Sequence, residues 1–95
     1  MANVNITVFE AAVSTPLGDP LQYLTAVIDG ANSSALTGSD KKRRTCRMYA
    51  ESDCWVKWGS SPTATGATDA VALGADNPEY FNIEAGHVVT AITRT

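Results

Sequence analysis

Ninety-five residues, of which 44% are hydrophobic and 18% charged, make a single domain over residues 1–95, and this small size argues against a deep enclosed active site. No apolar run approaches the ~20 residues that span a bilayer, and the first residues lack the basic flank and apolar core of a secretory signal. We therefore expect synthesis in the cytoplasm and no membrane partner.

Seven short segments have the composition and alternation of β-strands. The first covers residues 4–10, where Val4, Ile6 and Val8 share one face. The others are predicted over residues 22–28, 43–50, 54–58, 70–73, 79–83 and 88–93. No window has the apolar spacing of a substantial helix. The sequence predicts an all-β fold, an antiparallel β-sandwich or a jelly-roll-like barrel.

The strands at 43–50 and 54–58 are separated by only three residues, which predicts a hairpin. Cys46 and Cys54 would lie symmetrically about its turn, where a cross-strand disulfide is geometrically feasible. A chain kept in the cytoplasm normally holds its thiols reduced, so we favour buried, unpaired core thiols. The cysteine spacing does not match a zinc site, and we expect neither metal nor cofactor.

The strand at 54–58 leads into a Gly, Ser, Pro and Thr-rich loop over residues 59–69, which we expect at the surface. Trp58 shares a face with Cys54 and is predicted to be in the core. Trp55 lies on the other face and is either an exposed interface anchor or covered by a loop.

Catalytic residue patterns are missing from the sequence. His87 follows a glycine at a turn, and no Ser or Cys with a nearby base forms a triad with it. Glycosidase chemistry needs two carboxylates held a defined distance apart. The sequence does not show how far Asp69 lies from Glu84. We therefore predict that the chain is not an enzyme.

Positive charge is concentrated in one segment. Residues 41–57 hold six of the seven Lys and Arg residues, whereas residues 1–40 hold four acidic residues and no Lys or Arg. The run Lys41, Lys42, Arg43 and Arg44 could be solvated, or could meet an acidic protein surface or a complementary patch on another copy. The sequence pI of about 4.8 argues against nucleic acid as the partner.

The C-terminal half resembles a group of small virion proteins of tailed bacteriophages. The resemblance is carried by the strand that runs into residues 59–65, the apolar residues 71–73, the aromatic strand at 80–83, and a Gly86-His87 turn before the last valine-rich strand. This group is similar to head decoration, or cement, proteins. The resemblance implies a β-sandwich or jelly roll on the capsid exterior that clamps neighbouring major capsid subunits.

The resemblance also implies partners and contact residues. The expected partners are the phage major capsid protein and the chain itself, as a homotrimer or, second, as a dimer. An N-terminal arm at residues 1–3 and the loops at 30–42 and 59–69 are the expected contacts. The interface residues predicted individually are Ala2, Asn3, Lys41, Lys42, Arg43, Arg44, Trp55, Ser60, Ser61, Pro62 and Thr63.

Two other functions remain open from the sequence. The chain could be a tail- or fibre-associated recognition module that binds a host glycan or protein, with Trp55 beside the Ser/Thr-rich loop as its binding feature. It could also be a regulator that binds a host protein and is absent from the particle. The number of copies in the virion distinguishes these functions from head decoration.

Overall fold

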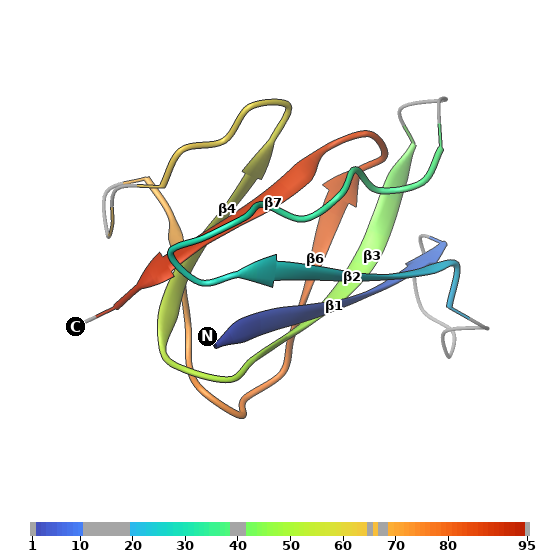
Figure 1. The fold of residues 1–95 in the computed structure, drawn as a ribbon. Helices are drawn as coiled ribbons and strands as arrows, with labels where there is room; N and C mark the ends of the chain where they lie inside the picture. The colour runs from blue at the N-terminus through green and yellow to red at the C-terminus, as the bar shows by residue number, and fades with distance from the viewer. Residues whose placement is uncertain (1, 11–19, 39–41, 65, 67–68, 95) are drawn as a thin grey trace.

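The computed structural model describes residues 2–10, 20–38, 42–64, 66 and 69–94, which form seven β-strands and no helix (Figure 1). The strands are β1 Asn3–Glu10, β2 Gln22–Val27, β3 Arg43–Ala50, β4 Cys54–Gly59, β5 Val71–Leu73, β6 Glu79–Glu84 and β7 Val88–Thr93. The all-β prediction is confirmed, and every strand begins and ends within one residue of its predicted position.

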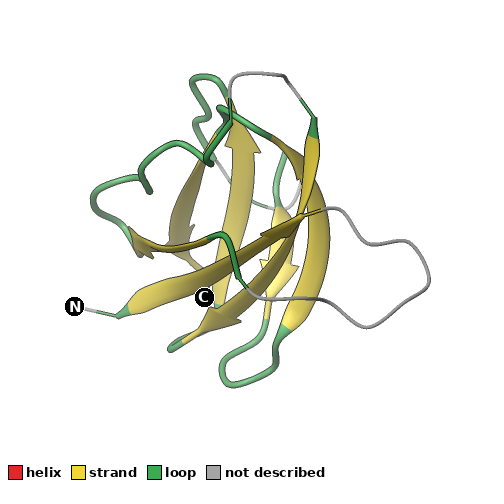
Figure 2. Ribbon diagram, turned by 90° about the vertical axis from the view of Figure 1, so that its right-hand side faces the viewer, coloured by secondary structure: helices red, strands yellow, loops and turns green. Residues whose placement is uncertain are grey.

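The strands form two antiparallel sheets that face each other as a small β-sandwich (Figure 2). One sheet has four strands in the order β2-β1-β3-β6, and the other has three in the order β5-β4-β7. Apolar side chains alternate with polar ones along most strands, so each sheet turns one face inward.

The predicted hairpin between β3 and β4 is wrong. The two strands belong to different sheets, and the connection at residues 51–53 crosses from one layer to the other. The β5–β6 turn holds this crossing in place, because Asp76 N–H donates to Ala50 O at 2.9 Å and Ala75 N–H donates to Asp53 Oδ1 at 2.8 Å. A three-residue connection therefore serves here as an arch between sheets.

The core lies between the two inward faces. Val4, Ile6 and Val8 of β1 are at most 1% exposed, as their alternation predicted. Cys46 and Cys54 are also fully buried, and both are free thiols, which confirms the interpretation as unpaired core residues. Burial raises the pKa of Cys46 to about 12 and that of Cys54 to about 11.

The segment that follows β2 closes one side of the sandwich. It runs beside β7 in Figure 1. The backbone N–H groups of Asp29, Ser33 and Leu36 each donate a hydrogen bond of 2.9 Å. The acceptors are the carbonyl oxygens of Ala91 and Val89 in β7 and of His87 just before it. Gln22 of β2 binds the same segment, since its side-chain amide accepts from Thr37 N–H and donates to Ala35 O. Leu36 is 1% exposed. The segment thus covers the β7 edge in place of a strand.

Candidate interaction surfaces

The outward face of the four-stranded sheet carries a row of side chains, one from each strand. Thr7 of β1 lies opposite Tyr23 of β2 and Arg47 of β3, and Arg47 lies opposite Tyr80 of β6. The residues before and after Thr7 and Arg47 on their strands are fully buried, so these two side chains point outward. The row therefore runs across the full width of the sheet.

Two tyrosines mark the ends of this row. Tyr23 is 75% exposed and Tyr80 is 55% exposed, and both rank among the most exposed large hydrophobic side chains of the described residues. Three strand spacings of ~4.8 Å separate the outer strands, so the backbones at Tyr23 and Tyr80 lie about 14 Å apart across the sheet. We call the surface formed by Thr7, Tyr23, Arg47, Tyr49 and Tyr80 the tyrosine face.

A chain of contacts holds Arg47 on the tyrosine face. Its guanidinium carbon lies 5.7 Å from the centre of the Tyr49 ring, within the range of a cation–π interaction. Tyr49 Oη in turn donates a hydrogen bond to Asp76 Oδ1, which raises the pKa of Tyr49. Asp76 is fixed at a tight turn, where it has a φ of 58°. Arg47 makes no ion pair with any residue that the structure describes.

The predicted basic segment lies at the start of β3. Lys42 and Arg43 are exposed, Arg44 is half-buried with its Nε donating to Thr37 O at 3.3 Å, and Lys41 lies outside the described residues. Both arginines lie opposite an acidic residue on the neighbouring strand, Arg43 opposite Glu84 of β6 and Arg44 opposite Glu10 of β1. These neighbours reduce the local positive charge below what the sequence run alone indicates.

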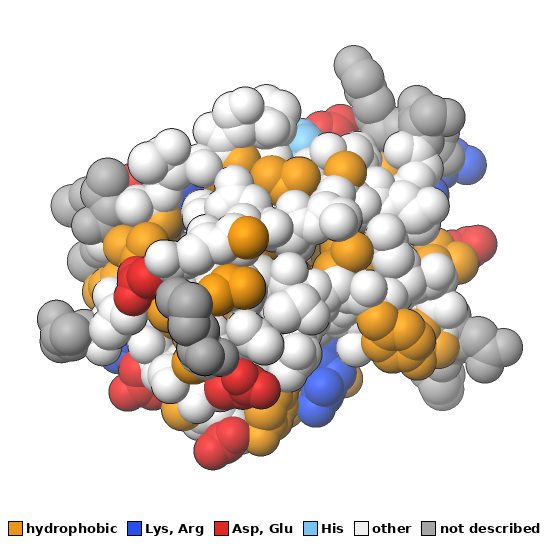
Figure 3. All heavy atoms as spheres, viewed as in Figure 1, with side chains coloured by type: hydrophobic (Ala, Val, Ile, Leu, Met, Phe, Trp, Pro, Cys, Tyr) orange, Lys and Arg blue, Asp and Glu red, His pale blue; other side chains and the backbone are white. Residues whose placement is uncertain are grey.

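Acidic side chains gather at the other end of the sandwich. Figure 3 shows Asp and Glu side chains at its lower left, around the connections between β3 and β4 and between β5 and β6. Glu51, Asp53 and Asp76 are exposed there. Each also accepts a hydrogen bond from a neighbouring segment, so they fix the turns of this end.

The two tryptophans of β4 have different surroundings. Trp58 packs against the core, with its ring centre 4.9 Å from that of Phe81 on β6 and the rings tilted by 48°. Trp55 points away from the core and is half-buried, and the Arg94 guanidinium lies 5.8 Å from the centre of its ring. Arg94 also pairs with Asp53 at 3.7 Å. Trp55 is therefore partly covered by a side chain from the end of β7.

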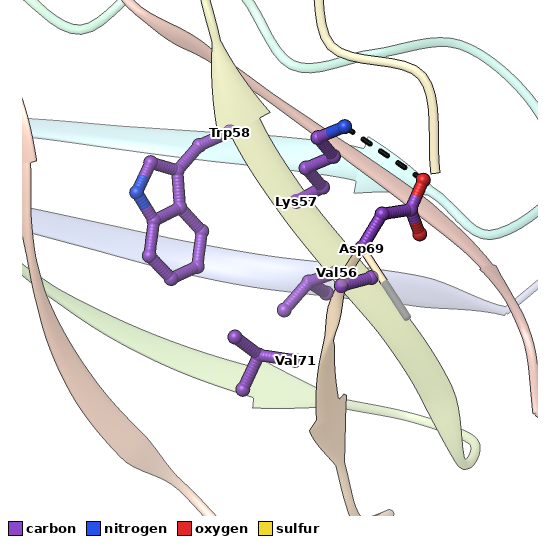
Figure 4. Close-up of a pocket in the computed structure, with 6 residues that line it drawn as sticks. Val56, Lys57, Trp58, Asp69 and Val71 are labelled. Carbon is purple, nitrogen blue, oxygen red and sulfur yellow. Dashed lines mark ion pairs between the residues drawn. The ribbon is translucent and has the colours of Figure 1, made fainter. Parts of the chain in front are cut away.

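The loop after β4 is exposed at Ser60, Ser61 and Thr63, whereas Pro62 is half-buried and Ala64 is buried. Lys57 holds this loop at its middle and at its end, because its Nζ donates to Thr63 O at 3.3 Å and pairs with Asp69 at 3.7 Å. Figure 4 shows Lys57 and Asp69 together, with Trp58 directed away from them. The expected surface loop is thus fastened to its own strand.

Two shallow cavities flank Trp58. One of about 450 Å³ is lined by Val56, Lys57, Trp58, Asp69, Ala70 and Val71 (Figure 4). The other, of about 370 Å³, is lined by Arg43, Trp58, Asn82, Glu84 and His87. Asp69 and Glu84 therefore lie in different cavities, and Glu84 Oε2 is 2.8 Å from His87 Nε2. No group of three His, Cys, Asp or Glu side chains among the described residues could hold a metal ion.

The structure places Asn3 in the four-stranded sheet and Ala2 directly before it. Ala2 O accepts a hydrogen bond from Ile28 N–H at 3.0 Å. Asn3 is the first residue of β1, and its N–H donates to Glu51 Oε1 at 2.8 Å. Met1 lies outside the described residues. In this structure residues 2 and 3 pair with their own chain.

No protein-family model matches this chain, and neither the curated proteins nor the solved structures contain a significant match. No helix in the described ranges is long and apolar enough to cross a membrane. The structure itself defines the class of the molecule as a small antiparallel β-sandwich.

The tyrosine face was not found from the sequence, because its residues come from four separated segments. Part of the signal was present, since Arg47 and Tyr49 alternate with the buried Cys46 and Met48. The strand order β2-β1-β3-β6 was needed to add Tyr23 and Tyr80. Of the residues predicted for the interface, Trp55 and the 60–63 loop belong to β4 and its continuation, whereas Lys42, Arg43 and Arg44 lie at the end of the other sheet.

Proposed function

We propose that this chain is a structural virion protein of a tailed phage that decorates the capsid exterior and cements neighbouring major capsid subunits. The observation that carries the proposal is the tyrosine face, with Tyr23 75% exposed and Tyr80 55% exposed on the outside of a four-stranded sheet. Tyrosine and arginine are enriched in protein interfaces, where they contribute much of the binding energy. The resemblance of the C-terminal half to phage decoration proteins supports the same role.

The scaffold suits a protein that binds through its surface. Its strands are tied by antiparallel ladders, and the segment after β2 seals the edge of β7. A rigid scaffold loses little conformational entropy when it docks. Self-association, as a trimer first and a dimer second, would place several copies of the face on one symmetric capsid position and multiply a weak single contact. This role requires no cofactor and no catalysis.

The basic segment would form a second contact in this role. Lys42 and Arg43 are exposed at the start of β3, where they could meet an acidic surface of the capsid or of a sister subunit. Reversing both charges tests the assignment. We expect the Lys42→Glu/Arg43→Glu variant to bind particles more weakly at low salt, and unchanged binding would remove this segment from the interface.

A tail- or fibre-associated recognition module is the second candidate. The exposed rings of Tyr23 and Tyr80 favour it, because aromatic faces also stack on sugar rings. Such a module would bind a host glycan or protein instead of the capsid shell. It would be present in far fewer copies per particle than a decoration protein.

Quantitative mass spectrometry of purified particles of the phage that encodes the chain tests the proposal. The measurement is the number of copies of this chain per copy of the major capsid protein. A fixed ratio near one-to-one supports head decoration, whereas a handful of copies per particle supports the tail or fibre module. Absence from the particle would overturn both and would favour a host-protein partner.

A further inference from the structure

The tyrosine face combines apolar rings with a single charge. Tyr23 and Tyr80 stand on the two outer strands, and Thr7 and Arg47 lie between them in the same row. Thr7 and both tyrosines are uncharged, so Arg47 carries the only charge of the row. A partner that covers the row must therefore provide both apolar contact and a group that balances one guanidinium.

The Arg47 guanidinium is oriented before any partner arrives. It lies over the Tyr49 ring, and the Tyr49 hydroxyl is held by Asp76. Among the described residues the guanidinium has no hydrogen-bond acceptor or ion-pair partner, so its N–H donors are available to a binding partner. A planar guanidinium held in this way fits a carboxylate through two parallel hydrogen bonds.

Charge distinguishes between the candidate partners. Two copies that met through this face about a two-fold axis would bring Arg47 against Arg47, which like-charge repulsion disfavours. A nucleic acid would be repelled by a chain with a net charge of −3. A protein surface with an exposed carboxylate among apolar side chains complements both the charge and the rings.

We infer that the tyrosine face is a docking surface for a protein that presents a carboxylate to Arg47 and apolar side chains to Tyr23 and Tyr80. The inference rests on the proposed function, in which that protein is the major capsid protein. Arg47 then selects the partner, because an interface that buries it without a carboxylate leaves a charge unpaired. The two rings supply apolar contact on either side of the charge.

The test uses purified chain and particles assembled without it, with bound chain measured by co-sedimentation over a range of concentrations. Three variants alter the face: Arg47→Ala removes the charge, Arg47→Lys keeps the charge but loses the paired donors, and Tyr23→Ala removes the most exposed ring. The matched control is Arg94→Ala, which removes a guanidinium lying over Trp55 beside the three-stranded sheet.

We expect Arg47→Ala to weaken binding by at least about 30-fold, the loss typical when one partner of an interfacial charge pair is truncated. Arg47→Lys should fall between the wild type and Arg47→Ala, because an ammonium supplies charge without the bidentate geometry. Tyr23→Ala should weaken binding by about tenfold or more. Arg94→Ala should bind like the wild type, and the melting temperatures of the Arg47 and Tyr23 variants should stay close to that of the wild type.

The outcomes separate this inference from the proposed function. If the wild-type chain binds particles and the Arg47 and Tyr23 variants bind equally well, the docking face is wrong while the decoration role stands. If the wild-type chain does not bind particles, the decoration role falls and the inference that rests on it falls too. Weakened binding by Arg47→Ala and Tyr23→Ala, with Arg94→Ala unchanged, supports both.

Discussion

Ser33 and Val89 exchange two hydrogen bonds, because Ser33 N–H donates to Val89 O at 2.9 Å and Val89 N–H donates to Ser33 Oγ at 2.9 Å. Ser33 is 5% exposed and Val89 is fully buried, so water cannot replace either bond easily. The serine side chain thus accepts from a backbone N–H on the edge of β7 that has no neighbouring strand. It also joins the irregular segment after β2 to the three-stranded sheet.

Replacing Ser33 with alanine should therefore destabilise the protein by about 1–3 kcal/mol, since the Val89 N–H would be left buried without an acceptor. Urea unfolding monitored by tryptophan fluorescence gives the free energy of unfolding. Ser34→Ala is the matched control, because Ser34 is the exposed next residue and its substitution should change stability by less than about 0.5 kcal/mol. Equal stabilities of the two variants would show that the Ser33 side chain does not stabilise this edge of β7.

Trp58 and Phe81 join the two sheets through a contact between their rings. Their ring centres are 4.9 Å apart in a tilted arrangement, and the two residues lie on β4 and β6, which belong to different sheets. A double-mutant cycle of Trp58→Leu and Phe81→Leu should give a coupling energy of about 0.5–1.5 kcal/mol. The same cycle with Tyr80→Leu in place of Phe81→Leu should give a coupling near zero, because Tyr80 points to the outer face. Similar couplings in the two cycles would contradict the contact.

The strands were predictable from the sequence because their periodicity is local. Val4, Ile6 and Val8 alternate with polar residues and are all buried, and the strand positions follow from such patterns. Pairing between strands is not local. The three residues between β3 and β4 are compatible with either a hairpin or a crossing, and contacts with Ala75 and Asp76, more than twenty residues along the chain, hold the crossing.

The segment after β2 was expected to be an exposed contact loop for a related reason. Its polar composition and lack of a period are typical of loops. Leu36 is nevertheless 1% exposed, because backbone groups of this segment pair with β7 and bring the leucine over the core. The tyrosine face also depends on long-range order, since no single strand contains more than two of its residues.

The buried thiols give a prediction about reactivity and alkaline stability. Desolvation raises the pKa of Cys46 to about 12 and of Cys54 to about 11, from an ordinary value of 9.0. The folded protein should therefore resist iodoacetamide at pH 8, whereas both cysteines should react in urea. In the unfolded chain the two thiols lose their protons near pH 9, whereas in the folded chain they lose them only at higher pH. The burial of the neutral thiols therefore contributes fully to stability below pH 9, and this contribution is lost as the pH rises through the pKa values of the folded state.

Mass spectrometry of the alkylated protein checks this prediction, with labelling in urea as the positive control. The Cys46→Ala and Cys54→Ala variants allow each thiol to be assigned separately. Rapid modification of either cysteine under native conditions would mean that the two sheets separate far more often than the closed core allows.

Asp29 gives the opposite pH dependence at acid pH. It adopts a φ of 61° in the turn that follows β2, and its carboxylate accepts hydrogen bonds from the Thr93 hydroxyl and from Thr93 N–H, the latter at 2.9 Å. The hydroxyl bond first and the backbone bond second lower the pKa of Asp29 from its ordinary 3.8. The folded state thus favours the carboxylate, so this stabilisation is present above pH 3.8 and is lost as pH falls through the lower folded pKa.

The Asp29→Asn variant should remove this pH dependence while keeping the backbone turn, because asparagine also tolerates a left-handed φ and can accept from Thr93 N–H. We expect its melting temperature to be lower than that of the wild type at pH 6 and the difference to shrink as the pH falls below 3.8. Thr93→Val should act in the same direction, since it removes the hydroxyl donor that contributes most to the lowered pKa. Parallel melting curves for the wild type and Asp29→Asn across this range would show that the carboxylate of Asp29 does not fasten β2 to the end of β7.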